Sequence, residues 1–235
     1  MAIAFERIEA LTFDCYGTLI DWEGGLLREL RGLLDVHDAA QPSDDRLLET
    51  FARHEVRWEA GAYLPYREVL GRTLRDLCAE LGVTPSTDEL RDFGSSVGRW
   101  PVFSDSAGAL AALAGRFRLG IITNCDDDLF EASRRRLGVE FEWAVTAQQA
   151  GSYKPQRHNF ELALERIALP RERIVHVAQS LFHDHVPAKR LGLSTTWIDR
   201  RHDQPGFGAT PPASAQPDLT VRDMTSFARV ALALR

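Results

Sequence analysis

The sequence predicts an α/β protein in which a doubly wound parallel sheet carries an inserted helical domain. Short apolar runs of strand length alternate with amphipathic stretches along most of the 235 residues, and this alternation favours parallel strands covered by helices on both faces. One segment, from about residue 22 to residue 98, contains helical patterns only. Several polar side chains directly follow predicted strands, which is where open α/β sheets bind their ligands.

Six apolar runs predict the strands of the sheet. The first, at residues 8–13, has the character of a buried strand and ends immediately before Asp14. The later runs predict strands at residues 119–123, 141–145, 174–178, 194–198 and 219–221. Because helical patterns separate them, we expect these strands to pair in parallel.

Amphipathic patterns fill the intervals between the strands. They predict helices at residues 107–114, 129–137, 160–167, 186–191 and, after the last strand, 225–234. Gly138 and Gly192 stand at the ends of two of these segments, where a helix often finishes in a glycine. Residues 200–217 are rich in Pro, Gly, Ala, Asp and Gln and predict a surface loop.

The all-helical segment contains two periodic patterns and one capping pattern. Helical spacing predicts one helix over residues 47–58 and a second over residues 69–81, which Gly82 ends. Ser86 and Glu89 have the spacing of a capping box at the start of a third helix. We interpret this segment as a lid over the strand ends. The chain is therefore divided into an α/β core, residues 1–19 and 99–235, and a helical cap domain, residues 20–98.

Composition and charge limit the classes of function. Hydrophobic residues make up 44% and charged residues 26% of the chain, as in ordinary globular proteins. The net charge of −6 offers no global basic surface for nucleic acid or an acidic membrane, and no apolar run is long enough to span a bilayer. Cys15, Cys78 and Cys125 are few and odd in number, and residues 1–7 lack a secretory leader pattern. These features predict a cytoplasmic protein without structural disulfides.

Residues that can carry out chemistry follow the predicted strands. Asp14 follows the first strand, and a carboxylate in this position is a candidate nucleophile. Thr123, Asn124, Lys154 and residues 180–184 come after other strands. Although these positions are far apart in sequence, a parallel sheet brings the carboxyl ends of its strands to one edge. We therefore expect them to form one site.

The same positions resemble the four motifs of the haloacid dehalogenase superfamily. Residues 14–18 (DCYGT) are similar to the first motif and residues 122–124 (ITN) to the second. Residues 153–155 (YKP) resemble the third motif, and residues 177–184 (VAQSLFHD) occupy the position of the fourth. Four motifs in order, with a helical block between the first two, identify the chain as a member of this superfamily.

Two positions distinguish branches within the superfamily. Tyr16 stands where the phosphatases have a second Asp, the acid that protonates a phosphate-ester leaving group. Gln179 stands where they have an Asp that helps to hold magnesium, so Asp14 and Asp184 remain as the acidic residues. The resemblance implies the (S)-2-haloacid dehalogenase branch, which works without a metal or another cofactor. A magnesium-dependent phosphatase of a small phosphate ester and an inactive relative that binds a small acid are the alternatives.

The reaction implied by this resemblance needs no acid, because halide leaves carbon as a stable anion. Asp14 would attack the carbon and form an ester, which water would hydrolyse. Lys154 would keep Asp14 ionised, since a nearby ammonium lowers a carboxylate pKa by roughly 1–3 units. Asp184 would hold Lys154 or help to activate water. The implied partners are a small 2-haloacid and water, with a homodimer as the assembly.

The resemblance also implies which side chains contact the substrate. They are Tyr16, Thr18, Thr123, Asn124 and Ser180 from the core and Arg53 from the lid. The Thr123 hydroxyl and the Asn124 amide would bind the substrate carboxylate. Arg53 would hold the halide, with Arg57 one helical turn later as the alternative. The two histidines that flank Asp184 do not predict a metal site, because no other His or Cys cluster has ligand spacing, and contact with the substrate pocket is the alternative role.

Overall fold

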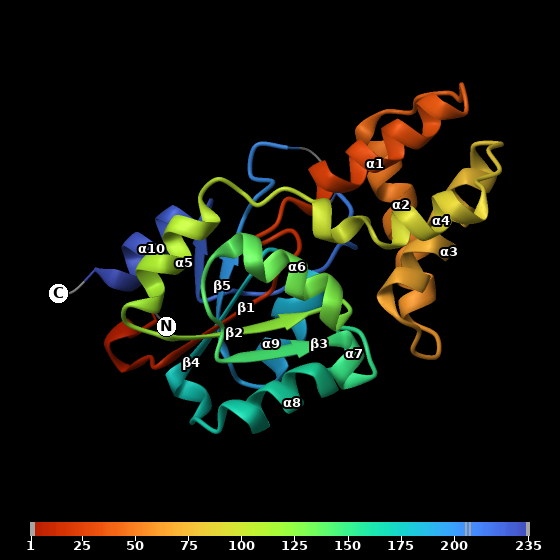
Figure 1. Ribbon diagram of the computed structural model, residues 1–235. Coiled ribbons are helices and arrows are strands. Elements are labelled where there is room, and N and C mark those ends of the chain that lie inside the picture. Colours follow the sequence, from red (N-terminus) through yellow and green to blue (C-terminus); the bar gives the residue numbers. More distant parts are fainter. Residues whose placement is uncertain (1–2, 205, 207, 234–235) are drawn as a thin grey trace.

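The computed structural model describes residues 3–204, 206 and 208–233. Its centre is a six-stranded sheet with the order β3-β2-β1-β4-β5-β6, and every neighbouring pair is parallel (Figure 1). The strands are β1 (Ala10–Phe13), β2 (Arg118–Thr123), β3 (Trp143–Thr146), β4 (Ile174–Ala178), β5 (Ser194–Ile198) and β6 (Leu219–Val221). All six predicted strands are present, and the predicted α/β fold class is confirmed.

The first strand lies in the middle of the sheet. β1 pairs with β2 on one side and with β4 on the other, and all its residues are buried. Strand order therefore reverses direction at β1, which makes its carboxyl end the switch point of the sheet. Asp14 follows directly, with its backbone N–H donating to the Val177 carbonyl at 3.1 Å. The topology thus places the predicted nucleophile where open α/β sheets bind ligands.

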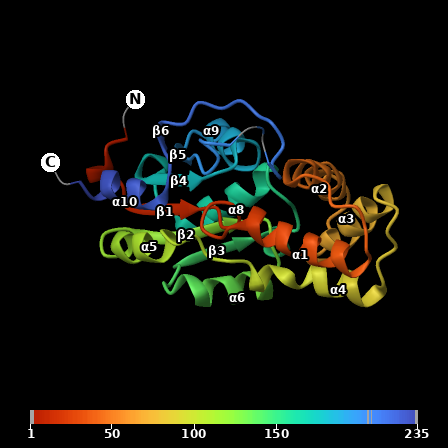
Figure 2. The same ribbon diagram turned by 90° about the horizontal axis from the view of Figure 1, so that it is seen from above.

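Helices cover both faces of the sheet (Figure 2). Leu11 and Phe13 of β1 share one core with α5 (Ser106–Ala114), α6 (Asp127–Leu137) and α10 (Met224–Leu232). Ala10 shares a second core with α8 (Arg157–Ile167) and α9 (Val186–Arg190). This division follows from the alternation of side chains along a strand. The helices of the core are α5 (Ser106–Ala114), α6 (Asp127–Leu137), α7 (Ala147–Ala150), α8 (Arg157–Ile167), α9 (Val186–Arg190) and α10 (Met224–Leu232). Shorter helical turns are η1 (Phe5–Arg7), η2 (Ser96–Arg99), η3 (Arg171–Arg173) and the π-helical turn η4 (Leu181–His185).

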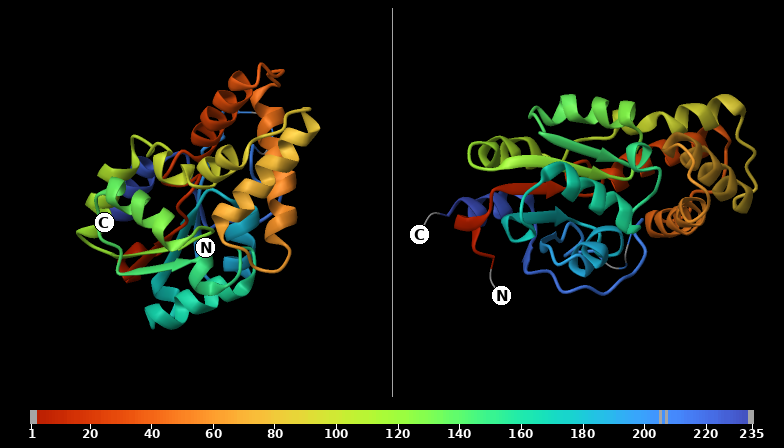
Figure 3. Two further views of the ribbon diagram at one scale, coloured as in Figure 1. Left: turned by 45° about the vertical axis from the view of Figure 1, so that its right-hand side comes forward. Right: turned by 90° about the horizontal axis from the view of Figure 1, so that it is seen from below.

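Four further helices form the lid. They are α1 (Trp22–Val36), α2 (Asp44–Glu59), α3 (Tyr66–Glu80) and α4 (Thr87–Gly94). Figures 1 and 3 show them grouped together to one side of the sheet, the side toward which the strand arrows point. No strand interrupts this part of the described chain, as the sequence predicts. The division into a core and a cap at residues 20–98 stays a prediction.

Several helix ends follow from single residues. Ser86 and Glu89 form the predicted capping box at the start of α4. Gly82, just beyond α3, and Gly138, at the end of α6, have φ angles of +72° and +71°, a conformation that glycine adopts without steric cost. The last helix ends at Leu232, and residue 234 of the predicted helix lies outside the described residues.

The segment predicted as a surface loop, residues 200–217, turns partly inward. Ala209 and Thr210 are buried, and the Ala209 N–H donates to Glu23 Oε1 of helix α1 at 2.9 Å. The loop therefore packs against the lid, and Thr210 reaches the pocket between lid and sheet.

Two further observations concern the helices and the cysteines of the described chain. No helix in the described part of the chain has the length and apolar character that a membrane span requires. Cys15, Cys78 and Cys125 are buried and unpaired.

Candidate active site

Three charged side chains meet beyond the strand ends. Asp14 follows β1, Lys154 precedes α8, and Asp184 lies in η4, which follows β4. Lys154 Nζ donates to Asp14 Oδ1 at 2.9 Å and to Asp184 Oδ1 at 2.7 Å. Its third bond goes to the Ile122 carbonyl at 2.9 Å, so every ammonium proton has an acceptor. The structure thus brings the three predicted catalytic residues together in a buried cluster.

Burial and charge act in opposite directions on this cluster. Desolvation raises the pKa of Asp14 and the Asp184 charge raises it further, although Lys154 and Thr18 oppose both effects. This net direction corrects the lowering expected from Lys154 alone. Burial also tends to raise the pKa of Asp184, but Lys154 and His176 outweigh it and the pKa is lowered. Burial tends to lower the pKa of Lys154, yet the two carboxylates raise it. Asp14 is therefore the member of the cluster that protonates first on acidification.

Two predicted substrate ligands instead position the catalytic residues. Thr18 Oγ1 donates to Asp14 Oδ2 at 2.6 Å and accepts the Gln179 N–H at 2.9 Å. Asn124 Oδ1 accepts the Lys154 N–H at 2.7 Å, and its Nδ2 donates to the Lys154 carbonyl at 3.1 Å. Thr18 therefore orients the Asp14 carboxylate, and Asn124 fixes the backbone that carries Lys154.

Of the other core residues predicted to contact the substrate, two line the pocket and one does not. Tyr16 and Ser180 line the pocket, but the Tyr16 hydroxyl lies 3.0 Å from Ser133 Oγ of α6. Ser180 Oγ accepts the His183 N–H at 2.9 Å and caps η4. Thr123 is fully buried away from the pocket lining, and its hydroxyl has no hydrogen-bond partner in the described structure. The structure therefore does not bring Thr123 to a substrate.

His176 is a site residue that the sequence reasoning missed. Its Nε2 lies 2.8 Å from Asp184 Oδ1, and its Nδ1 lies 2.9 Å from Thr12 Oγ1. The ring of Phe160 packs edge-on against it, with centroids 5.1 Å apart. The available signal was a histidine inside an apolar strand, because a buried polar side chain requires a partner. Asp184 Oδ2, in contrast, is buried without a partner in the described structure.

The lid faces the cluster with carboxyl groups and aromatic rings. Glu55 and Glu59, one helical turn apart on α2, are 3% and 8% exposed. Tyr66 OH donates to Glu55 Oε1 at 2.8 Å, whereas Glu59 Oε1 is 3.4 Å from Asn124 Nδ2. The pocket is lined by Asp14, Tyr16, Trp22, Glu55, Glu59, Tyr66, Asn124, Lys154, Gln179, Ser180, His183, Asp184 and Thr210. Its volume of about 40 Å³ holds a few water molecules.

The structure does not bring the predicted halide ligands to this pocket. The Arg53 side chain is 58% exposed and donates to Glu80 at 2.7 Å. Arg57 is 61% exposed. Residues two positions apart lie about 200° apart around a helix, so Glu55 and Glu59 on the inner face turn Arg53 and Arg57 outward. The role expected for Arg53 is corrected accordingly.

Comparison with known proteins connects this geometry to a family. The sequence profile described as haloacid dehalogenase-like hydrolase matches residues 8–181. The chain belongs to this family. This haloacid dehalogenase-like hydrolase is 27% identical over 225 residues to haloacetate dehalogenase H-2 of Moraxella sp. (strain B). The match covers 92% of this chain and 94% of that protein. The chain is 25% identical over 218 residues to (S)-2-haloacid dehalogenase H-109 of Pseudomonas putida, which covers 88% of this chain and 92% of that protein.

A solved relative shares the fold of this haloacid dehalogenase-like hydrolase. The L-2-haloacid dehalogenase of Xanthobacter autotrophicus, solved with chloropropionic acid covalently bound, matches with a TM-score of 0.78. The match covers 97% of this chain and 100% of that chain at 18% identity. The similarity extends over both the sheet and the lid.

In this haloacid dehalogenase-like hydrolase the site offers fewer carboxylates than the magnesium site that the phosphatase pattern implies. Lys154 Nζ donates to both Asp14 and Asp184, so each of these carboxylates already has a cationic partner. Tyr16 and Gln179 add no carboxylate. Within the described residues, no three His, Cys, Asp or Glu side chains are arranged to hold a metal ion. The cluster is thus built around an ammonium group.

Proposed function

We propose that the chain is a hydrolytic dehalogenase of small 2-haloacids, with Asp14 as its nucleophile. The observation that carries this proposal is that the Asp14 carboxylate accepts hydrogen bonds from Lys154 at one oxygen and from Thr18 at the other. The carboxylate lies at the switch point of the sheet and lines a pocket closed by the lid. Family membership supports the proposal, as do relatives named haloacetate and (S)-2-haloacid dehalogenase.

The first step is displacement at carbon. The Asp14 carboxylate attacks the carbon that carries the halogen, a carbon–oxygen bond forms, and the carbon–halogen bond breaks. Halide leaves with the electron pair of that bond, so no proton is needed. Tyr16 agrees with this chemistry, because its hydroxyl is engaged with Ser133 and supplies no acid beside Asp14. Lys154 stabilises the ionised form of the nucleophile before attack.

The second step is hydrolysis of the aspartyl ester. Water attacks the carboxyl carbon of Asp14, and the bond between this carbon and the substrate oxygen breaks. One proton of the water goes to the departing oxygen to give the hydroxyacid, the other is released to solvent, and Asp14 is regenerated as a carboxylate. Asp184 lines the pocket and has one buried oxygen without a partner in the described structure. That oxygen is suited to accept a hydrogen bond from the attacking water. Lys154 stays on Asp14 Oδ1, where its charge favours addition to the ester carbonyl.

Halide release separates this proposal from its alternatives. The purified chain is incubated with 2-chloropropionate, bromoacetate and fluoroacetate in EDTA. We expect halide release that Asp14→Asn abolishes and that Asp88→Asn, a control at a side chain 80% exposed, leaves unchanged. If a small phosphate ester is supplied in place of the haloacids, phosphate release that depends on added magnesium would instead identify a phosphatase. A folded protein that releases no halide from any haloacid would contradict the proposal and leave a small-acid-binding relative. The homodimer and the cytoplasmic location stay predictions.

A further inference from the structure

The pocket contains more carboxyl groups than its own lysine pairs with. Asp14, Asp184, Glu55 and Glu59 all line it, and Lys154 is the one lysine or arginine among the described lining residues. Lys154 donates to the first two carboxylates, as given above. Glu55 and Glu59 are left without a cationic side chain in contact among the residues that the structure describes.

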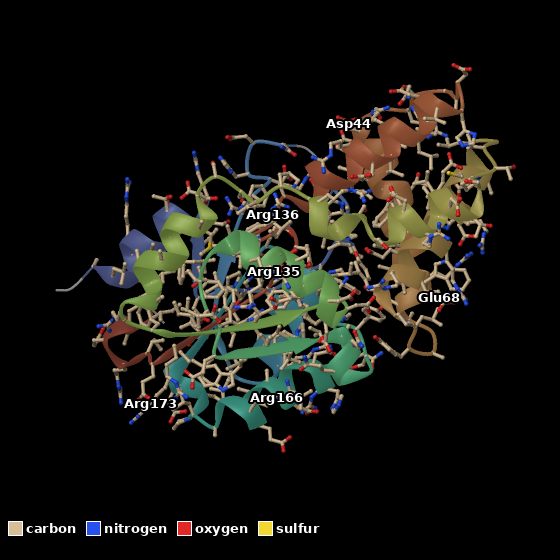
Figure 4. The ribbon with its side chains drawn as sticks, in the orientation of Figure 1. Asp44, Glu68, Arg135, Arg136, Arg166 and Arg173 are labelled. Carbon is tan, nitrogen blue, oxygen red and sulfur yellow. The ribbon has the colours of Figure 1, made fainter. Side chains whose placement is uncertain are left out.

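The two arginines next to these glutamates in the sequence of α2 do not fill this gap. Arg53 and Arg57, on the same helix as the two glutamates, bind Glu80 and Asp76 on its outer face. Figure 4 shows the labelled Arg173 over the end of the core that is remote from the lid. The acidic character of the lid wall is therefore a property of the pocket itself.

Aromatic rings accompany the two glutamates. Trp22 and Tyr66 line the same pocket, together with Tyr16 from the sheet edge. The Trp22 ring is held edge-on against Phe51, with centroids 6.2 Å apart. The face of an aromatic ring attracts an ammonium group, and desolvation strengthens this attraction. Carboxylates and aromatic rings around one cavity are the surroundings that a cationic ligand requires.

An imidazole nitrogen on the core side of the same pocket also lacks a partner in the described structure. His183 is 8% exposed and lines the pocket, and its Nε2 makes no hydrogen bond in the described structure. The nearest carboxylate atom, Glu59 Oε2, is 3.8 Å away, beyond hydrogen-bond distance. Burial lowers the pKa of His183 to about 4, so the imidazole is neutral. Because Nδ1 lies 3.2 Å from Ser180 Oγ, Nε2 is the ring nitrogen left to form a hydrogen bond with a ligand.

The titration of the two glutamates is consistent with a missing cation. Burial raises the pKa of Glu55 to about 8, and burial together with the Glu55 charge raises the pKa of Glu59 well above its ordinary value. A positive charge placed between them would favour the ionised form of both.

We propose that the substrate carries an ammonium group, which Glu55 and Glu59 hold against Trp22 and Tyr66 while the electrophilic carbon faces Asp14. The substrate class is a small haloacid that also bears an amine. The inference rests on the proposed function for the position of the electrophilic carbon, whereas the ammonium subsite rests on the lid wall. Glu55 and Glu59 are thus specificity-determining residues.

Binding of product-like acids tests the subsite without any turnover. 4-Aminobutanoate and pentanoate have the same number of heavy atoms and differ by an ammonium in place of a methyl group. We expect 4-aminobutanoate to raise the Tm of the protein more than pentanoate does. Glu55→Gln or Glu59→Gln should weaken the binding of 4-aminobutanoate about tenfold, which corresponds to about 1.4 kcal/mol of binding free energy. Glu49→Gln, at an exposed position of α2, should leave the binding of 4-aminobutanoate unchanged.

Turnover of a matched substrate pair completes the test. Halide release from 4-amino-2-chlorobutanoate is compared with release from 2-chloropentanoate. We expect kcat/KM to favour the amine about tenfold, and Glu55→Gln or Glu59→Gln to remove that preference. Equal binding of both acids, or a preference that survives both glutamate substitutions, would overturn the inference. Binding of 4-aminobutanoate with no halide release from either chloroacid would instead overturn the proposed function and leave the ammonium subsite standing.

Discussion

His176 Nε2 lies 2.8 Å from Asp184 Oδ1, and the two side chains are 0% and 1% exposed. Asp184 in turn accepts a bond from Lys154, which holds Asp14. On its other side His176 contacts Thr12 of β1. A hydrogen-bonded chain thus runs from β1 through β4 to Asp14, the proposed nucleophile. The orientation of the ammonium beside Asp14 therefore depends on a histidine outside the pocket lining.

Loss of the His176 hydrogen bonds should reduce both stability and turnover. His176→Leu leaves Asp184 and Thr12 each without one partner, and an unsatisfied buried polar group costs about 1–3 kcal/mol. We expect a decrease of that size in the free energy of unfolding, measured in urea, and a fall of about tenfold in kcat for halide release. His176→Gln keeps a donor near the Nε2 position and should recover part of both. If the Leu variant turned over as fast as the wild type, His176 would have no positioning role.

The buried glutamate of the lid should give stability a distinctive pH dependence. The pKa of Glu55 is about 8 in the folded protein, against roughly 4.3 for Glu in an unfolded chain. The folded state binds more protons between these values, so the free energy of unfolding decreases as pH rises, by at most about 1.4 kcal/mol per unit for one proton. Urea unfolding from pH 5 to pH 8 measures this slope.

A matched pair of variants assigns that slope to its source. Glu55→Gln removes one of the two glutamates whose pKa is raised, the other being Glu59, and should make the decrease between pH 5 and pH 8 shallower. Glu49→Gln on the exposed face of α2 should retain it. The same slope in all three proteins would mean that another group is responsible.

Arg53 should be dispensable for catalysis. Its side chain is 58% exposed and pairs with Glu80, which is 42% exposed, and exposed ion pairs contribute about 0–1 kcal/mol. Arg53→Gln should therefore change the free energy of unfolding by less than about 1 kcal/mol and leave kcat/KM for halide release within about twofold, less than 1 kcal/mol of barrier. A fall of two orders of magnitude in kcat/KM would show instead that Arg53 reaches the substrate.

The residues whose position at the strand ends was predicted each have a recognisable feature in the sequence around them. Asp14, Asn124 and Lys154 lie next to apolar strands or motif turns, and parallel pairing brings those ends together. Arg53 has no such feature. The apolar spacing of α2 runs through Phe51 and includes Glu55, which already places position 53 on the opposite face. The error came from following a family pattern across the lid rather than the helix period.

His176 and the acidic lid wall could not be predicted for a different reason. Whether a buried polar residue is a site residue depends on its partner, and the partner of His176 comes from η4. Glu59 reaches the pocket because α2 lies across the strand ends. Such contacts arise from the packing of separate elements, and a periodic pattern in one element does not contain them.

Thr18 offers a test of how Asp14 is kept ionised. The threonine hydroxyl donates to Asp14 Oδ2 at 2.6 Å, and this bond opposes the burial that raises the pKa of Asp14. Thr18→Val keeps the shape and removes the donor, so the pKa of Asp14 should rise further. Because the ionised Asp14 is the proposed nucleophile, activity should be lost as pH falls through this pKa, and the acid limb of kcat/KM should move to higher pH.

Thr18→Ser separates this electrostatic effect from a loss of packing. Serine retains the donor to Asp14 and the acceptor for the Gln179 N–H, which lies 2.9 Å from the threonine oxygen. Its acid limb should coincide with that of the wild type, even if the missing methyl group lowers stability. An acid limb that stays fixed in Thr18→Val would show that Lys154 alone sets the ionisation of Asp14. A limb that shifts in Thr18→Val only would assign part of that control to the threonine hydroxyl, the group that the sequence placed at the substrate.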